Sequence, residues 1–143
     1  MTETFTILNQ ESIYEAYTPL VEKLVLTPQG ALIVLTGPLG AGKTTLVQAL
    51  AKKLGSSAQV SSPTYTLIHE YPTPQGTLVH IDAYRLPSTE ALLDLGLEDY
   101  LERSKLVVVE WGEGLLKHFP DAWQVTLSFA GKNRKAEFVK RSK

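Results

Sequence analysis

The sequence predicts an α/β fold: a three-layer sandwich with a mainly parallel central sheet and antiparallel additions. Two apolar runs, residues 31–36 (ALIVLT) and 105–111 (KLVVVEW), are typical of strands covered on both faces of a parallel sheet. The first run leads through a glycine-rich loop into a helical pattern. Alternating segments near the carboxyl end, residues 123–129 and 134–140, indicate an antiparallel hairpin. Strands that alternate with helices early, followed by a late hairpin, favour this sandwich.

The bulk composition restricts the class of protein. A length of 143 residues favours one domain spanning residues 1–143. Fourteen basic and fifteen acidic residues give a net charge of −1, so no overall field concentrates the protein on RNA or on a membrane. The absence of cysteine excludes disulfides and thiolate chemistry. The first residues lack a signal-peptide pattern, and no apolar run approaches the roughly 20 residues of a membrane span, so we expect a soluble cytoplasmic protein.

Helical patterns occur in three places. Ser12 and Glu15 fit a capping box, and residues 46–54 form an apolar stripe that Gly55 ends. The apolar residues of the first helical pattern are Ile13, Tyr14, Tyr17, Leu20, Val21 and Leu24. In residues 87–104, Ser88 fits an N-cap and Gly96 fits a break, which predicts two short helices.

Two pairs of strands are expected outside the central runs. Residues 64–71 (TYTLIHEY) and 77–84 (TLVHIDAY) flank the turn sequence PTPQG, which predicts a hairpin or two adjacent strands. Residues 123–129 (WQVTLSF) and 134–140 (RKAEFVK) alternate apolar and polar positions around AGKN. This alternation predicts an antiparallel hairpin with one wet face.

The loop GPLGAGKTTL, which begins at Gly37, is typical of a phosphate-binding loop. It matches the pattern G-x-x-x-x-G-K-[ST], in which backbone amides wrap a polyphosphate, the lysine contacts the β/γ-phosphates and the hydroxyl binds Mg²⁺. A glycine-rich turn with a surface lysine is the alternative, but the strand before and the helix after favour phosphate binding and a P-loop NTPase-like fold. The predicted nucleotide-binding residues are Gly37, Pro38, Leu39, Gly40, Ala41, Gly42, Lys43, Thr44 and Thr45.

Two acidic residues end predicted strands that would lie beside this loop. Glu110 follows LVVV and Asp82 follows TLVHI. In α/β nucleotide sites, ligands of the metal and the water lie at the carboxyl ends of strands. Glu110 is therefore a candidate Mg²⁺ ligand with Thr44, and Asp82 a candidate catalytic residue with Lys43 and Glu110. Each acid alone also fits a strand-end cap or a turn.

Several neighbouring residues leave alternatives open. Arg85 either pairs with Asp82 or reaches the γ-phosphate. Trp111 could stack near a base or anchor a partner, although an ordinary aromatic residue is favoured, and for His80 a packed or hydrogen-bonded histidine is favoured over a base. Residues 61–67 (SSPTYTL) fit either a segment that senses the γ-phosphate or a plain entry into a strand. The basic tail KNRKAEFVKRSK fits contact with RNA or acidic partners, or simply a solvated strand.

Four motifs in this order, GPLGAGKTTL, SSPTYTLIHEY, HIDAYRL and VVVEWGE, resemble the bacterial TsaE (YjeE) family of P-loop ATPases. The resemblance extends from about Ile7 to about Phe138. It implies an ATPase that uses ATP and Mg²⁺ and joins two other protein subunits of the tRNA threonylcarbamoyladenosine (t6A) transferase complex, whose turnover it drives. The transfer of the threonylcarbamoyl group would belong to the partner, contact with tRNA would be indirect, and no membrane is implied.

The resemblance also implies roles for particular residues. The loop from Gly37 to Lys43 would hold phosphate, Thr44 and Glu110 would bind Mg²⁺, and Asp82 would take part in hydrolysis. The Ser62-Pro63-Thr64 turn would be a switch-like segment near the partner, and Trp111 would flank the metal acid. Arg134 corresponds loosely to a basic position that contacts the nucleotide.

Two rival functions use the same loop. A small-molecule kinase of the P-loop class would transfer the phosphoryl group to an acceptor hydroxyl. The sequence lacks an obvious arginine-rich lid, and 143 residues leave little room for an acceptor domain, which disfavours the kinase. A module that only senses ATP would bind it tightly without turnover.

Overall fold

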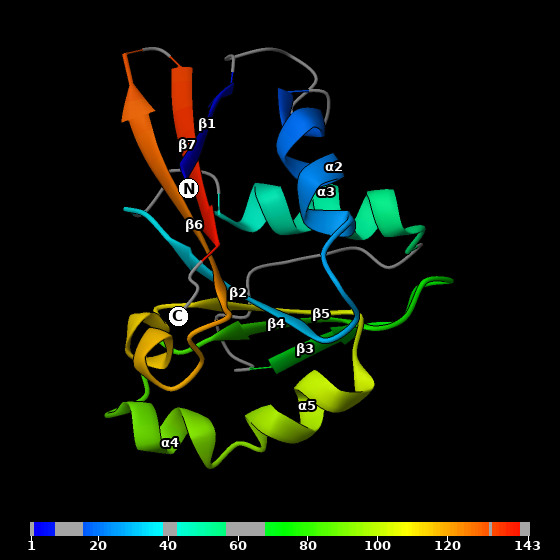
Figure 1. Cartoon of the computed structure of the whole chain (residues 1–143), viewed down its shortest axis with the longest axis vertical. Helices are drawn as coiled ribbons and strands as arrows, with labels where there is room; N and C mark the ends of the chain where they lie inside the picture. Colours follow the sequence, from blue (N-terminus) through cyan, green and yellow to red (C-terminus); the bar gives the residue numbers. More distant parts are fainter. Residues whose placement is uncertain (1, 8–15, 39–42, 57–67, 132, 141–143) are drawn as a thin grey trace.

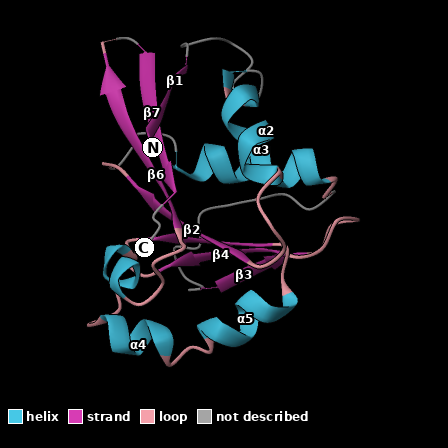
Figure 2. Cartoon of the chain, viewed as in Figure 1, coloured by secondary structure: helices cyan, strands magenta, loops and turns pink. Residues whose placement is uncertain are grey.

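The protein forms one seven-stranded sheet with helices packed against both faces (Figures 1 and 2). The computed structural model describes residues 2–7, 16–38, 43–56, 68–131 and 133–140. The order of the strands across the sheet is β1-β7-β6-β2-β5-β4-β3. Their bounds are β1 Thr2–Ile7, β2 Ala31–Thr36, β3 Ile68–Tyr71, β4 Leu78–Asp82, β5 Leu106–Glu110, β6 Trp123–Ala130 and β7 Asn133–Lys140.

The middle of the sheet is parallel and its two edges are antiparallel. Strand β2 pairs in parallel with both β5 and β6, and β5 pairs in parallel with β4. Strands β7 and β1 continue the sheet beyond β6, and β3 continues it beyond β4, by antiparallel pairing. Every residue of β5, and every residue of β2 except Thr36, is buried, as expected of strands covered on both faces. The predicted α/β sandwich with a parallel core is confirmed.

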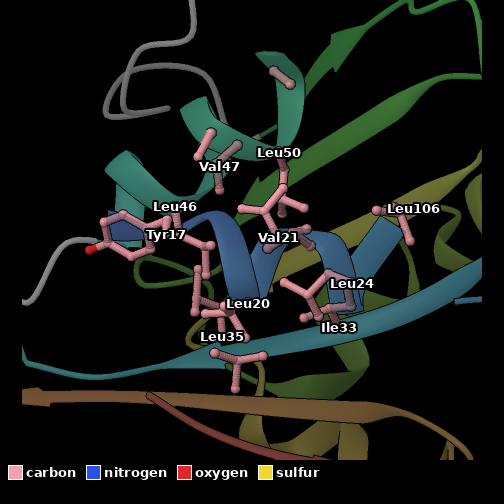
Figure 3. Close-up of a cluster of buried hydrophobic side chains, with 14 of the residues drawn as sticks. Tyr17, Leu20, Val21, Leu24, Ile33, Leu35, Leu46, Val47, Leu50 and Leu106 are labelled. Carbon is pink, nitrogen blue, oxygen red and sulfur yellow. The ribbon is translucent and has the colours of Figure 1, made fainter. Parts of the chain in front are cut away.

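One face of the sheet is covered by α2 (Thr18–Val25) and α3 (Lys43–Leu54), which bury the larger apolar cluster. Figure 3 shows side chains of both helices converging on β2 and β5. The labelled residues are Tyr17, Leu20, Val21, Leu24, Ile33, Leu35, Leu46, Val47, Leu50 and Leu106. Both predicted helices are confirmed over their described residues, and Gly55 follows α3 with a φ of 93°. The predicted capping box at Ser12 and Glu15 lies outside the described residues.

The opposite face is covered by shorter helices (Figure 1). These are α4 (Thr89–Leu93), α5 (Leu97–Arg103) and the 3₁₀ helix η1 (Glu113–Lys117). The Ser88 side chain accepts a hydrogen bond of 3.1 Å from the Ala91 amide, and Gly96 has a φ of 90° between α4 and α5. The N-cap and the break predicted from the sequence are therefore confirmed.

Both predicted hairpins are present. Strands β3 and β4 pair antiparallel, with His69 opposite His80, although residues 64–67 of the predicted first strand lie outside the described residues. Strands β6 and β7 pair antiparallel along their whole length. In the middle of the hairpin the inward positions are buried and the positions between them are partly exposed, as the alternating pattern predicts, whereas Phe129 near the turn is exposed. The buried set is Val125, Leu127, Ala136 and Phe138.

The sequence analysis did not predict two elements, β1 and η1. Strand β1 adds to the sheet edge beside β7, with Phe5 opposite Ala136 and Ile7 opposite Arg134. Ile7 is buried, Phe5 packs against the larger apolar cluster, and the threonines beside them are exposed. This alternation of apolar and polar residues is the signal that could have predicted the strand.

No helix in the described part of the chain is long and apolar enough to cross a membrane. The longest helix among the described residues, α3, has 12 residues, whereas a membrane-spanning helix needs about 20.

Candidate functional site

The site residues predicted from the sequence gather at the carboxyl ends of the parallel strands. Glu110 is the last residue of β5, and it lies opposite Leu35 of β2 on one side and Asp82 of β4 on the other. Along β4 and β5, the apolar residues Leu78 and Val108 belong to the cluster under α2 and α3. Side chains two residues apart on a strand share a face, so Asp82 and Glu110 project on the side where α3 begins. The register therefore brings both acids to the face of the sheet on which α3 begins.

Gly37, the first residue after β2, has a backbone that only glycine suits. Its φ is 149°, and a Cβ added here would lie 2.6 Å from the carbonyl oxygen of Leu127 in β6. Strand β6 thus runs directly against the start of the loop. Pro38 follows at the surface, and residues 39–42, which hold the rest of the predicted phosphate loop, lie outside the described residues.

Replacing Gly37 by alanine is expected to destabilise the protein by about 1–3 kcal/mol, because the new methyl group meets the β6 backbone and the φ is unfavourable. Gly131→Ala is the matched control: its φ of 64° is also positive, but no heavy atom lies within 4 Å of the added Cβ. Urea unfolding should show the larger loss for Gly37→Ala. Equal losses in the two variants would mean that the β6 backbone does not constrain the loop.

Lys43, the first residue of α3, is a buried cation at the centre of the site. Its exposed fraction is 7%, and its Nζ donates a hydrogen bond of 2.8 Å to the Gly37 carbonyl oxygen. The same Nζ lies 3.7 Å from Glu110 Oε1. A buried ammonium needs such partners, because burying an unpaired charge is costly. Thr44 and Thr45 follow in the first turn of α3, and both are half-buried.

Glu110 has both carboxylate oxygens engaged. Oε1 faces Lys43, and Oε2 lies 2.5 Å from Nε2 of His80, whose side chain is fully buried in β4. The prediction that His80 is a hydrogen-bonded histidine is confirmed. Its hydrogen-bond partner was not predicted. This partner is Glu110, the acid that the sequence analysis proposed as a Mg²⁺ ligand.

Asp82 is half-buried at the end of β4, and its Oδ1 accepts a hydrogen bond of 3.0 Å from the Tyr84 amide. The carboxylate therefore caps the turn after the strand, in addition to lying beside Glu110. Arg85 is exposed, and among the described residues no ion pair joins it to Asp82. Of the two alternatives for Arg85, pairing with Asp82 is thus not observed.

Trp111 follows Glu110 in an unusual conformation. Its φ of 63° is positive, which is true of no other non-glycine residue in the described part of the chain. Its ring centroid lies 4.5 Å from Lys43 Nζ and 5.0 Å from the ring of Tyr84, and 44% of the residue is exposed. A cation over an aromatic face is attracted by the ring quadrupole. Trp111 is therefore part of the lysine's surroundings, whereas the sequence favoured an ordinary aromatic residue.

Arg134 lies at the same end of the sheet as the loop. Thr36 is the last residue of β2 and pairs with Thr126, so the rest of the β6–β7 hairpin extends past the end of β2. Arg134 lies opposite Phe129 there, with its guanidinium 6.0 Å from the phenyl ring. Burial raises the pKa of the Tyr17 hydroxyl, and the positive charge of Arg134 partly opposes this shift, so the arginine also lies near the residue preceding α2.

The residue types at the site fit a magnesium ion shared with phosphate. Mg²⁺ prefers oxygen ligands and is usually bound by one or two carboxylates together with phosphates and water. The Glu110 carboxylate, which lies 3.7 Å from Lys43 Nζ, and the hydroxyl of Thr44, the residue after Lys43 in α3, are oxygen donors of this kind. Among the described residues, no cluster of three or more His, Cys, Asp or Glu side chains is placed to hold a metal. The proposed switch residues Ser62, Pro63 and Thr64 lie outside the described residues.

Comparisons with known proteins agree on one family. The model of the family described as "Threonylcarbamoyl adenosine biosynthesis protein TsaE" matches residues 7–139. A protein of Treponema pallidum with the name tRNA threonylcarbamoyladenosine biosynthesis protein TsaE is 40% identical over 103 residues, which cover 72% of this chain and 75% of the relative. A Haemophilus influenzae protein of the same name is 39% identical over 93 residues, 63% of this chain and 59% of the relative.

A solved structure has the same fold. The crystal structure of Bacillus subtilis YdiB superposes with a TM-score of 0.75 at 26% sequence identity, covering 99% of this chain and 87% of that chain. The family model spans most of the sequence, including β2, α3, β4 and β5, which carry Gly37, Lys43, Asp82 and Glu110. The chain therefore belongs to the TsaE family of threonylcarbamoyl adenosine biosynthesis proteins.

Proposed function

We propose that this protein binds ATP and hydrolyses it with Mg²⁺, as an accessory subunit of the t6A modification complex. The observation that carries the proposal is the position of Lys43: at the start of α3, its ammonium group lies between the Gly37 carbonyl oxygen and the Glu110 carboxylate. A loop lysine opposite a strand-end acid is the arrangement that a magnesium–triphosphate needs, because it offers positive charge to phosphate and an oxygen ligand to the metal.

The phosphate end of the nucleotide would lie over the first turn of α3. Lys43 would exchange its contact with Gly37 for the β- and γ-phosphate oxygens. Residues 37–45 would supply backbone amides, and the helix start adds its partial positive charge. Arg134, on the hairpin that extends past the end of β2, is proposed as a further nucleotide contact.

Hydrolysis would proceed by attack of water on the γ-phosphorus, with release of ADP and phosphate. Asp82 would orient the attacking water from its place beside Glu110, while Lys43 would stabilise negative charge on the transferring group. Thr44 and Glu110 would hold the metal, which neutralises charge on the β- and γ-phosphates when it is bound. Trp111, whose ring lies over Lys43 Nζ and contacts the tilted ring of Tyr84, would shield the lysine from water on its exposed side.

The partners are proposed from the family. We infer that two other protein subunits form the t6A transferase, that they carry out the transfer in the cytoplasm, and that the ATP cycle of this chain allows their turnover. The net charge of −1 supports an indirect relation to tRNA, since affinity for phosphate backbones depends on local positive charge.

Reconstitution tests this proposal. The purified chain should release phosphate from ATP slowly by itself and faster when the two transferase subunits and Mg²⁺ are present, and t6A formation over repeated turnovers should depend on it. Colorimetric phosphate release and nucleoside analysis of the tRNA measure the two outputs. Phosphorylation of a small acceptor would instead identify a kinase, and tight ATP binding without hydrolysis under every condition would identify a sensor.

A further inference from the structure

His80 is a buried polar residue whose hydrogen-bond partner in the described part of the chain is an acid of the site. It occupies the middle of β4 with an exposed fraction of 0%, between the apolar residues Val79 and Ile81. Those two neighbours pack on the opposite face, in the cluster under α4 and α5. His80 therefore projects towards α3, on the same face as Asp82 and Glu110.

The hydrogen bond between His80 and Glu110 fixes one ring tautomer. Nε2 lies 2.5 Å from Glu110 Oε2, whereas Nδ1 is buried and has no hydrogen-bond partner among the described residues. A buried N–H without a partner costs more than a buried lone pair. The hydrogen therefore belongs on Nε2, which donates it to the carboxylate.

We propose that His80 is a positioning residue: by holding Oε2 of Glu110, it sets the rotation of the carboxylate so that Oε1 faces the start of α3. Oε1 lies 3.7 Å from Lys43 Nζ. This inference rests on the proposed role of Glu110 as a magnesium ligand. Outer partners that orient a ligand typically change metal affinity about 10–100-fold when they are removed.

The donated hydrogen bond also limits the pairing of Glu110 with Lys43 to one carboxylate oxygen, Oε1. Without it, both carboxylate oxygens are free to turn towards the ammonium group, since the side chains of Glu110 and Lys43 are each only 8% exposed and water competes little there. A lysine paired in this way is less available to phosphate, and the carboxylate is less available to a metal. With His80 in place, Oε2 of Glu110 accepts the hydrogen bond and Oε1 remains available to the metal.

A matched pair of substitutions isolates the hydrogen bond. Glutamine and methionine have side chains of similar length, but only glutamine carries an N–H donor at a position close to Nε2. Calorimetric titration should measure ATP affinity with and without Mg²⁺ for His80→Gln, His80→Met and the original protein. Mg²⁺ should raise the ATP affinity of the original protein. We expect this increase to be about 10–100-fold smaller in His80→Met and nearly unchanged in His80→Gln.

Controls separate positioning from stability. Val79→Ala removes volume from the adjacent buried position on the other face, so it should lower the unfolding temperature but leave the effect of Mg²⁺ on ATP affinity unchanged. An original protein whose ATP affinity does not respond to Mg²⁺ would contradict the proposed magnesium site. If folded His80→Met keeps the full effect of Mg²⁺ on ATP affinity, the positioning role of His80 is wrong, whereas the proposed magnesium site is not affected.

A measurement on the unaltered protein does not depend on the variants folding. Nitrogen-15 NMR of the His80 ring should show a protonated Nε2 and an unprotonated Nδ1, and the Nε2 proton should shift when Mg²⁺ is added to the ATP complex. A proton on Nδ1 instead of Nε2 would overturn the proposal, because His80 would then donate nothing to Glu110.

Discussion

Lys43→Ala is expected to reduce ATP hydrolysis by on the order of 100-fold or more, because it removes the positive charge that would stabilise the transferring phosphate. The side chain lies on a helix start and contacts polar groups, the Gly37 carbonyl oxygen and the Glu110 carboxylate, besides the ring of Trp111. Glu110 keeps its bond to His80 in the variant. The fold should therefore persist, with cooperative unfolding in a thermal melt.

The control for this experiment is Lys53→Ala, which removes an exposed lysine from the last turn of the same helix. Phosphate release should be unchanged in that variant, and ATP titration should show weakened binding for Lys43→Ala only. Turnover of Lys43→Ala at the rate of the original protein would place the phosphate site elsewhere. Loss of hydrolysis together with loss of cooperative unfolding would instead indicate a structural effect.

The fold was largely predictable because its signals are local. The run at residues 31–36 is apolar at almost every position, and Gly55, Ser88 and Gly96 mark helix ends by their own backbone or side-chain chemistry. Strand β1 was missed although its alternation was readable, since a six-residue edge strand has only three inward positions to show. The order of the strands in the sheet could not be predicted, because the order β6-β2-β5-β4 depends on crossovers between distant segments of the chain.

The positions of the candidate site residues in the fold were predictable from the sequence, but their contacts were not. The loop pattern and the two strand-end acids could be found because the chemistry requires particular residue types at strand ends. His80 precedes Asp82 by two residues, so the strand alternation could have placed both on the face of Glu110. Its bond to Glu110 depends on the register of β4 against β5, which joins residues 30 positions apart.

The contacts of Trp111 and Arg85 could not be predicted from residue type and spacing either. The ring of Trp111 reaches Lys43 because its backbone adopts a φ of 63°, a conformation that few residues other than glycine adopt. A tryptophan is expected to have a negative φ, so its residue type did not predict this conformation. For Arg85, a spacing of three residues from Asp82 left an ion pair and a reach to the γ-phosphate as alternatives; in the structure Asp82 accepts a hydrogen bond from the nearer Tyr84 amide.

Glu110→Gln is expected to lower Mg²⁺-dependent hydrolysis by on the order of 100-fold while leaving ATP binding without Mg²⁺ the same or tighter. Glutamine keeps the size of the side chain and an oxygen that can accept the bond from His80, but it removes the negative charge. That charge lies 3.7 Å from Lys43 and would repel phosphate oxygens. Without it, Lys43 is fully available to the nucleotide, and only the metal loses a ligand.

Titration with ATP alone and with ATP and Mg²⁺, alongside phosphate release, separates the two effects of Glu110→Gln. Glu113→Gln is the control, because it removes an exposed carboxylate from η1 only three residues further along the chain. Its Mg²⁺ response should equal that of the original protein. If Glu110→Gln also keeps the whole Mg²⁺ response, the ligand of the metal is another oxygen. Asp82, the register partner of Glu110, would then be the next residue to replace, because its carboxylate ends the adjacent strand on the same face.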